Sequence, residues 1–344
     1  MSDNEKKVVS IKTLAVYLNM SHATVSRALN DKSVISAATK EKVRAAAEKF
    51  GYVVNSGARL VRGMSGRLVG LIIPDVQNDF YSTVAKILAQ RCASEGLELI
   101  LAISDDDSAL EALHIRSMLE ARVAGIIITP TIALKQQEAR FLETVPCVQI
   151  IRRHELIKAG LIGINDQQGT QLATQHLLEL GHRQIGFIGG SRQLSTSADR
   201  LLGYQTALSD YKITAAKQVI ALGPPRPEFG RAAIEKIMTL DKKPTAFVMG
   251  SSQLTLGALQ ALRGMGLSVP HDVSIVGYGD PPWFELSAPP VTTVDLPVEA
   301  LSQEAATYLF SQIKNRDLAD KNPESIKAYP PSLRIRQSTQ KLQS

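Results

Sequence analysis

A short segment near the N-terminus concentrates side chains that can form hydrogen bonds to nucleic acid. His22 can donate to a guanine or accept from an adenine, and Ala23 beside it offers an apolar contact to a thymine methyl group. Arg27, about one helical turn later, can contact a guanine in a bidentate manner or reach a phosphate. Small polar side chains suited to phosphate oxygens accompany them, namely Ser10, Ser21, Thr24, Ser26, Asn30, Ser36 and Thr39.

The distribution of charge agrees with a phosphate-binding surface. Residues 1–67 contain 12 Lys or Arg and 5 Asp or Glu, so this segment carries +7. The remainder contains 27 basic and 28 acidic residues, so the whole basic excess lies in the first fifth of the chain. Clustered cations of this kind bind nucleic acid, whereas the alternative is a solvated surface that happens to be basic.

The same segment predicts three short helices. Ser10 and Ser21 are candidate N-caps for the first two, and the second helix carries an apolar stripe of Val25, Ala28 and Leu29. A third, longer helix follows Ser36 and stops at Gly51. Two short helices joined by a tight turn, with a third that completes a small core, predict a helix-turn-helix unit.

These motifs resemble a known family. The strings IKTLA at 11–15 and MSHATVSRALN at 20–30 are similar to the headpiece of LacI-type (LacI/GalR) transcriptional repressors, and the likeness extends over nearly the whole chain to 332–339. It continues through Val34-Ile35-Ser36, Lys42-Val43, Gly51-Tyr52, Asn55 and Ala58-Arg59. The resemblance implies a helix-turn-helix headpiece over 1–54, in which His22 and Ala23 face base edges.

Residues 55–66 contain Gly57, Gly63 and Gly66, which makes them poor at holding structure alone. Taken by themselves they are a flexible linker. The resemblance instead implies a hinge helix that folds on DNA and inserts an apolar side chain, here Val61, into the minor groove. Asn55 and Ala58 are the further DNA contacts that the resemblance implies in this segment.

From Leu68 onward, apolar strands alternate with amphipathic helices, which predicts α/β architecture with parallel sheets and helices on both faces. About 275 residues exceed one compact core, so two lobes are expected. The resemblance implies a two-lobed periplasmic-binding-protein-like core over 67–340 that binds the effector and dimerises. We expect lobe 1 at about 67–165 and 291–323 and lobe 2 at about 166–290 and 324–340, with crossovers near Asn165, Pro290 and Pro323.

Ligands of such sheets bind beyond the carboxyl ends of the strands. Asp75, Phe80 and Tyr81 follow the first strand, and Arg200 matches an arginine that reaches into the cleft throughout the family. The family commonly has Asp, Asn-Asp-Gln and Gly-Phe/Tyr-Asp-Asp where this chain has Ile151, Ser251-Ser252-Gln253 and Gly277-Tyr278-Gly279-Asp280. The predicted effector site comprises Asp75, Phe80, Tyr81, Arg152, Arg200, Ser251, Gln253, Asp280 and Trp283.

Two classes of effector follow from these residues. Two carboxylates that would accept hydrogen bonds from sugar hydroxyls are missing while Arg152 and Arg200 remain, which favours a sugar acid, a phosphorylated sugar or another anionic metabolite. The alternative is a neutral sugar bound through Asp75, Gln253, Asp280 and Trp283.

No catalytic residues, metal ligands or cofactors are predicted, because no nucleophile elbow, Walker loop or metal-ligand spacing occurs. With only Cys92 and Cys147, no long apolar run and no apolar leader, we expect a cytoplasmic protein associated with the nucleoid and not with a membrane. The resemblance implies a homodimeric repressor that binds a pseudo-palindromic double-stranded DNA operator and responds to a small molecule. A transport receptor and an enzyme on the same scaffold are the competing classes.

Overall fold

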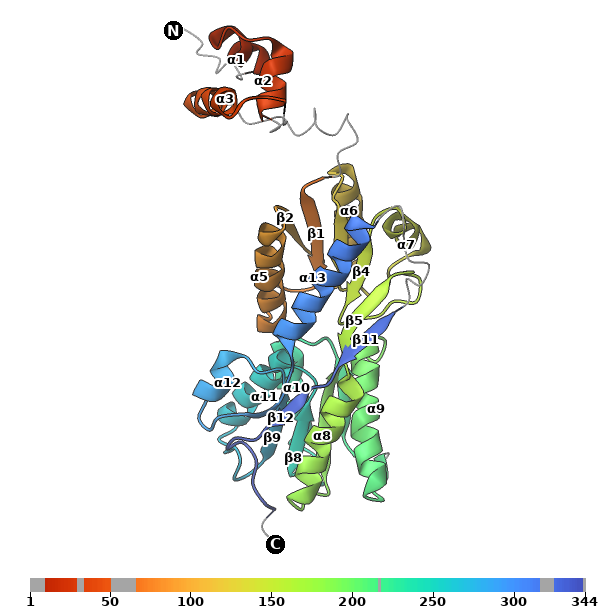
Figure 1. Cartoon of the computed structure of the whole chain (residues 1–344). Coiled ribbons are helices and arrows are strands. Elements are labelled where there is room, and N and C mark those ends of the chain that lie inside the picture. Colours follow the sequence, from red (N-terminus) through yellow and green to blue (C-terminus); the bar gives the residue numbers. More distant parts are fainter. Residues whose placement is uncertain (1–9, 30–33, 51–65, 216–217, 316–324, 343–344) are drawn as a thin grey trace, which may run out of the picture. The chain divides into compact units, whose positions relative to one another are not determined.

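The computed structural model describes residues 10–29, 34–50, 66–215, 218–315 and 325–342. The chain divides into two compact units, residues 1–65 and 66–344, which are described separately (Figure 1). The core was predicted to start at residue 67, one residue beyond the observed start of the second unit. In the described part of the chain, no helix is both long enough and apolar enough to cross a membrane.

The first unit contains three helices, α1 (Ile11–Tyr17), α2 (His22–Leu29) and α3 (Ala37–Lys49). They pack around a small core that includes Leu14, Val25, Ala28 and Val43. The turn between α1 and α2 passes through Asn19, whose φ of 50° lies in the left-handed region that asparagine tolerates.

All three helices begin with the same serine–threonine arrangement. The serine side chain accepts a hydrogen bond from the backbone N–H of the threonine three residues later, which satisfies a free donor of the first turn. These N–H to Oγ distances are 3.3 Å for Ser10–Thr13, 3.0 Å for Ser21–Thr24 and 3.3 Å for Ser36–Thr39.

The second unit contains two six-stranded sheets, each the centre of one lobe. The lobe 1 sheet has the order β11-β5-β4-β3-β1-β2 and is entirely parallel. Its strands are β1 (Leu68–Ile73), β2 (Glu98–Ile103), β3 (Gly125–Ile128), β4 (Cys147–Ile150), β5 (Gly160–Ile164) and β11 (Ile326–Tyr329).

The lobe 2 sheet has the order β12-β10-β9-β8-β6-β7 and is parallel apart from the antiparallel β12. Its strands are β6 (Ile185–Gly190), β7 (Ile220–Gly223), β8 (Ala246–Met249), β9 (Ser274–Tyr278), β10 (Thr292–Asp295) and β12 (Ser332–Arg334).

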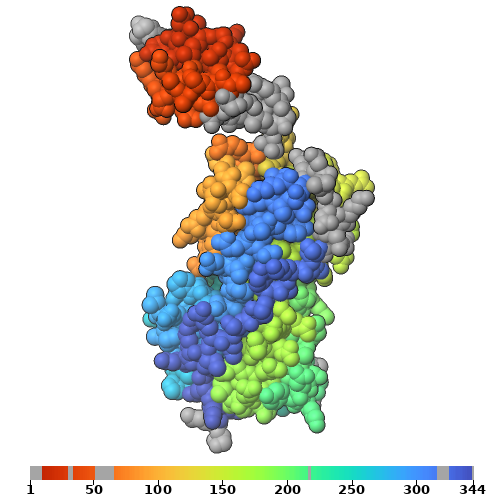
Figure 2. All heavy atoms as spheres, in the orientation of Figure 1, coloured from red at the N-terminus to blue at the C-terminus, as the bar shows by residue number. Residues whose placement is uncertain are grey.

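Helices cover both faces of the lobe 1 sheet. Side chains of α5 (Asp79–Ser94) and α13 (Val298–Lys314) pack with Val69 and Leu71, whereas α6 (Ser108–Glu120) and α7 (Gln136–Leu142) pack with Ile72 and Ile126. Figure 2 shows the blue α13 lying across lobe 1 beside the orange α5, although the two helices are far apart in the sequence. Strands that are buried on both faces explain the near-continuous apolar runs of the sequence.

In lobe 2 the helices are α8 (Asp166–Glu179), α9 (Ser195–Asp210), α10 (Pro227–Ile237), α11 (Ser252–Gly264) and α12 (Pro282–Leu286). Helices α8 and α9 pack against each other, as do α10 and α11 (Figure 1). The parallel sheets with helices on both faces confirm the predicted fold class.

The lobe boundaries differ from the expected ones at two places. Strand β10 pairs with β9 in lobe 2, and β11 pairs with β5 in lobe 1. Lobe 1 was expected to resume at about residue 291 and lobe 2 at about residue 324, so each expected boundary lies one strand too early. The chain leaves lobe 2 after Asp295 and returns to it after Tyr329, because each sheet takes one more strand before the crossover.

Close packing of α10 and α11 depends on two glycines. A Cβ at Gly257 would lie 1.9 Å from the carbonyl oxygen of Pro227, and a Cβ at Gly230 would lie 2.4 Å from that of Leu254. Both distances are far below van der Waals contact, so any side chain at these positions would push the two helices apart.

We therefore predict that Gly257→Ala destabilises the core by about 1–3 kcal/mol, the usual cost of overpacking. The matched control is Gly264→Ala on the same helix, where a Cβ would meet nothing within 4 Å. Because alanine is the better helix former, the control should be neutral or slightly stabilising. Urea denaturation of both variants checks this, and equal midpoints would contradict the packing argument.

The C-terminal segment is held on lobe 2 by two buried histidines. His176 Nε2 lies 3.0 Å from Thr339 Oγ1, and His182 Nε2 donates to the carbonyl oxygen of Gln340 at 3.1 Å. The other ring nitrogen of His182, Nδ1, lies 2.8 Å from Thr245 Oγ1. Burial lowers the pKa of both imidazoles, so the folded state favours their neutral forms.

This lowering of the pKa values sets a pH dependence. Histidines in the unfolded chain take up protons near pH 6.5, about their ordinary value, while the folded core resists protonation. The stabilisation is therefore complete above that pH and is lost as the pH falls below it. We predict that the melting temperature falls between pH 7.5 and 5.5, and falls less in His182→Gln. The exposed His271→Gln should retain the full decline.

Candidate nucleic-acid interface and ligand cleft

Helix α2 presents three of the predicted DNA-contacting residues to solvent. His22, Ala23 and Arg27 are exposed, and Thr24 is half-buried. Ser26 is buried at 7% exposure, between Val25 and Ala28 of the small core. Ser26 is therefore much less accessible than its neighbours on α2, and its predicted phosphate contact stays a prediction.

The remaining predicted contacts of the headpiece lie at the helix starts. Ser10, Ser21 and Ser36 are exposed and Thr39 is half-buried. The serine hydroxyls cap the N-termini of the three helices, and these helix ends face the solvent. Four predicted residues, Asn30, Asn55, Ala58 and Val61, lie outside the described residues.

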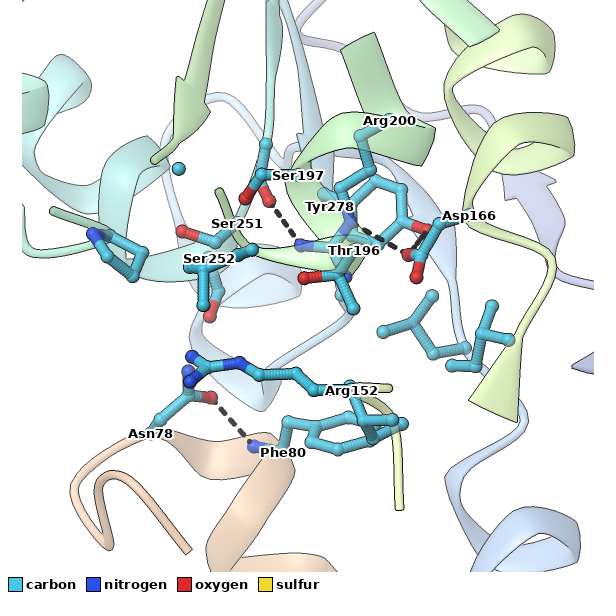
Figure 3. Close-up of a pocket in the computed structure, with 18 of the residues that line it drawn as sticks. Asn78, Phe80, Arg152, Asp166, Thr196, Ser197, Arg200, Ser251, Ser252 and Tyr278 are labelled. Carbon is cyan, nitrogen blue, oxygen red and sulfur yellow. Dashed lines mark hydrogen bonds and ion pairs between the residues drawn. The ribbon is translucent and has the colours of Figure 1, made fainter. Parts of the chain in front are cut away.

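A cavity lies between the two lobes of the core (Figure 3). Lobe 1 contributes Phe80 and Tyr81 from α5 and Arg152 from the loop after β4, whereas lobe 2 contributes Arg200 and Ser251. All five were predicted from the sequence, and they come together here. The Oγ of Ser251 is already used, since it accepts the backbone N–H of Leu254 at 3.2 Å and caps α11.

Arg200 is fixed by three groups of lobe 2. Its Nε donates to Asp166 Oδ1 at 2.7 Å, its Nη1 donates to the carbonyl oxygen of Gly250 at 2.6 Å, and its guanidinium carbon lies 4.0 Å from the centre of the Tyr278 ring. The hydroxyl of Tyr278 donates to the same Asp166 oxygen. Burial, together with the Asp166 carboxylate, raises the pKa of Tyr278 well above its ordinary value, so the hydroxyl stays protonated.

Arg152 has an equivalent carboxylate in lobe 1. Its two terminal nitrogens donate to the two oxygens of Asp106, in a fork with Nη2–Oδ2 at 3.3 Å. Ile151 before it has a φ of 68°, a left-handed conformation that is rare for a β-branched residue. Arg152 is itself buried, at 6% exposure, and lines the cavity next to Tyr81.

The cleft therefore holds more carboxylate groups near its two arginines than the sequence indicated. The sequence pointed to an anionic ligand because two carboxylates of the family pattern are missing while Arg152 and Arg200 remain, but Asp106 and Asp166 each pair with one of these arginines. Neither acid was among the predicted site residues, because each is reached only through tertiary contacts.

A second, outer cavity adjoins the first and shares Asn78, Tyr81, Arg152 and Pro225 with it. Two contacts join the lobes at this outer cavity. Arg226 of lobe 2 pairs with Asp105 of lobe 1 at 2.7 Å, and Gln253 Nε2 donates to the carbonyl oxygen of Gln77 at 3.4 Å.

The predicted residues Asp75 and Gln253 line the outer cavity, not the inner one. Asp280 and Trp283 line neither. Asp280 receives two hydrogen bonds of 2.8 Å from Arg336, and Trp283 packs edge-on against Phe284 with ring centres 4.4 Å apart. Arg336 of the C-terminal segment thus occupies the Asp280 carboxylate, and the two cavities give no support to the predicted ligand role of Asp280 or Trp283.

A helix-turn-helix unit and a two-lobed core with a ligand-sized cleft, in one chain, define the class of ligand-responsive DNA-binding proteins. Residues 10–55 match the model of the bacterial regulatory proteins of the lacI family, and residues 174–339 match a periplasmic binding protein-like domain. The chain belongs to the lacI family and is a DNA-binding transcriptional regulator with an effector-binding core.

Individual relatives support this assignment over the full length. The chain is 31% identical to the transcriptional regulator MalR of Streptomyces coelicolor over 336 residues, covering 95% of each protein. It is 29% identical to the transcriptional repressor PurR of Vibrio atlanticus, covering 90% of this chain and 93% of the relative. A crystal structure of the lac repressor dimer bound to operator and the anti-inducer ONPF superposes with a TM-score of 0.82 at 25% identity, covering 97% of this chain and all of that chain.

The Asp166 network yields a prediction for stability. Asp166→Ala would leave the Arg200 guanidinium and the Tyr278 hydroxyl without their shared acceptor, and breaking a buried pair from one side costs about 3–5 kcal/mol. Asp166→Asn should cost less, because the amide oxygen still accepts a hydrogen bond. The exposed Asp241→Ala is the control. Chemical denaturation measures the free energy of unfolding of all three variants. If Asp166→Ala is as stable as the control Asp241→Ala, Asp166 has no central role in stability.

Proposed function

We propose that this protein is a homodimeric transcriptional repressor that acts on DNA in the bacterial cytoplasm. It reads a pseudo-palindromic operator with α2 of each copy, and its operator affinity changes when a neutral, hydroxyl-bearing metabolite binds between the lobes. The observation that carries the proposal is the exposed row of His22, Ala23 and Arg27 on the second helix of a helix-turn-helix unit.

The choice of side chains on α2 supports base reading in addition to phosphate binding. Imidazole and guanidinium groups form directional hydrogen bonds to the purine edges of the major groove, and the methyl group of alanine suits thymine. The serine-capped starts of α2 and α3 suit phosphate oxygens, since helix N-termini attract anions. The exposed side chains of α2 would read the base sequence, whereas the contacts of the helix starts with phosphate would position the protein on the DNA.

An apolar rim at the edge of lobe 1 supports a homodimer. The edge strand β2 exposes Leu101 and Ile103, and the neighbouring α6 exposes Leu110 and Leu113, the last at 56%. Large apolar side chains grouped at a sheet edge favour burial against another surface. A second copy is the proposed occupant, in keeping with the dimeric lac repressor that the chain resembles.

The ion pairs of the cleft favour a neutral effector over an anionic one. Arg152 and Arg200 each interact with an aspartate, so a bound anion would have to compete with Asp106 or Asp166. Carboxylates at the cleft can instead accept hydrogen bonds from hydroxyl groups, and side-chain amides can both donate to hydroxyl groups and accept from them. Closure of the lobes on such a ligand would change the operator affinity by a coupling free energy of about 1–3 kcal/mol, the usual range for allosteric proteins.

Arg27→Ala tests the DNA-binding part of the proposal. We predict that it weakens binding to an operator selected from random duplexes by about 1–3 kcal/mol, the usual value of a bidentate base contact. Binding to unselected DNA should fall much less. Gel-shift titration of the full-length protein at fixed salt measures both affinities.

Lys42→Ala is the matched control, because it removes the same charge from the exposed side of α3. It should weaken selected and unselected DNA alike, as a phosphate contact does. If Arg27→Ala loses the same affinity for selected and for unselected DNA, Arg27 contacts phosphate and does not read a base. A wild-type protein that enriches no sequence from the random pool would disprove the proposed function.

A further inference from the structure

The two lobes of the core contact each other directly. At the outer cavity, Nη2 of Arg226 in lobe 2 lies 2.7 Å from Oδ1 of Asp105 in lobe 1. Elsewhere between the lobes, the backbone N–H of Arg153 in lobe 1 donates to Ser195 Oγ of lobe 2 at 3.0 Å. Protein groups alone can therefore hold the two lobes together.

The lobe 1 partner of the ion pair, Asp105, has a fixed position. It lies in a tight turn in which Asp105 and Asp106 both adopt left-handed conformations, and its backbone N–H donates to the carbonyl oxygen of Pro74 at 3.0 Å. The next residue of the turn, Asp106, forms an ion pair with the buried Arg152 of the cleft. One turn therefore directs one carboxylate toward lobe 2 and the other toward the ligand cleft.

The lobe 2 partner, Arg226, has a similarly constrained backbone. It is flanked by Pro224, Pro225 and Pro227, and a proline ring fixes the φ of its own residue and restricts the residue before it. The backbone N–H of Arg226 also donates to the carbonyl oxygen of Pro224 at 2.8 Å. An ion pair between two fixed backbone positions loses little more than side-chain freedom when it forms.

The charges on the two sides of the outer cavity favour this ion pair. Three carboxylates and one guanidinium line the cavity from lobe 1 and together carry −2, namely Asp75, Asp105, Asp106 and Arg152. From lobe 2 the charged lining residues are Arg226 and Glu228. Without Arg226, lobe 2 would set only the Glu228 carboxylate against the acidic side of lobe 1, and the two sides would repel each other.

We propose that Arg226 and Asp105 form a latch that keeps the two lobes closed without a ligand. The nearby hydrogen bond from Gln253 to the backbone of Gln77 adds to the same closure. The closed arrangement is then the major state of the protein by itself, and opening of the latch limits access to the inner cavity. The inference goes beyond the proposed function, because it concerns the core with neither DNA nor effector bound.

The test measures how often the cleft opens, with a cysteine placed inside it as the reporter. Ser197 lines the inner cavity and is 4% exposed, so Ser197→Cys provides a thiol that should react when the lobes separate. The probe is iodoacetamide, a small uncharged reagent, added to the full-length protein without ligand or DNA. Mass spectrometry measures the reaction rate of each thiol separately, and the native Cys92 and Cys147, which line neither cavity of the cleft, serve as references. Ser252→Cys, 8% exposed in the same cavity, is the second reporter should the first variant fold poorly.

A double-mutant cycle in this reporter protein isolates the ion pair. We expect Arg226→Gln and Asp105→Asn each to raise the reaction rate of the inserted cysteine about two- to fivefold, the effect of losing an ion pair of this exposure. Asparagine tolerates the left-handed conformation of position 105, so the substitution removes the charge alone. The double variant should react no faster than either single variant, because the same pair is lost only once.

Arg231→Gln is the matched control, since it removes the same charge from α10 while its partner, Glu235, lies on the same helix. Its reaction rate should equal that of the reporter protein alone. The latch is overturned if both single variants react at the unchanged rate. It is also overturned if the increase in the double variant is the product of the two single increases.

Salt gives an independent readout, because dissolved ions screen an exposed ion pair. Raising sodium chloride from about 0.05 M to about 0.5 M shortens the screening length about threefold. This change should raise the reaction rate in the reporter protein and leave the rate of the double variant unchanged. An equal response to salt in both proteins contradicts the ion-pair latch.

Gel-shift titrations of the same variants separate this inference from the proposed function. Faster thiol reaction without any change in operator affinity would support the latch and count against the proposed coupling of closure to DNA binding. Unchanged thiol reaction together with sequence-selective DNA binding would overturn the latch and leave the repressor proposal standing.

Discussion

The shared carboxylate of Asp166 is the contact on which the inner cleft depends. It accepts hydrogen bonds from Arg200 on α9 and from Tyr278 at the end of β9, and it is the first residue of α8. Three elements of lobe 2 therefore converge on one group, directly after the chain has crossed from lobe 1. A guanidinium with a free choice of rotamers would be a poor recognition group, whereas one fixed by a carboxylate, a carbonyl and a ring is preorganised for a ligand.

Local signals predicted the elements that local forces stabilise. The serine–threonine caps identify the starts of α1, α2 and α3, and strand β1, buried except at Leu68, reads as an uninterrupted apolar run. The strands β10, β11 and β12 have only three or four residues, too few for a periodic pattern. Their places are set by pairing with remote strands, so the second and third crossovers fall later than expected.

The residues of the ligand cleft also divide into those that local sequence signals predict and those that only tertiary contacts bring to the site. Phe80, Tyr81, Arg152 and Arg200 could be predicted because they follow strands or match a family position. Asp106 could not, since it lies 46 residues from Arg152 within a run of three aspartates that reads as a helix cap. Asp107 of that run does cap α6, while Asp105 and Asp106 adopt left-handed conformations with φ values of 51° and 57° and form ion pairs with arginines. Sequence spacing carries no information on such pairs.

Strand β1 runs from the start of the core, next to the segment that leads to the headpiece, directly to the ligand cleft. Its amino end begins at Leu68, two residues into the core unit, and its carboxyl end leads to Asp75 and to the aromatic residues of α5 at the cleft. It lies between β3 and β2, with all but one of its residues buried, so it has no freedom to bend independently of lobe 1. A ligand that moves lobe 1 against lobe 2 therefore moves both ends of β1 as one body. Any displacement of lobe 1 is therefore shared by the cleft end of β1 and by its amino end at Leu68.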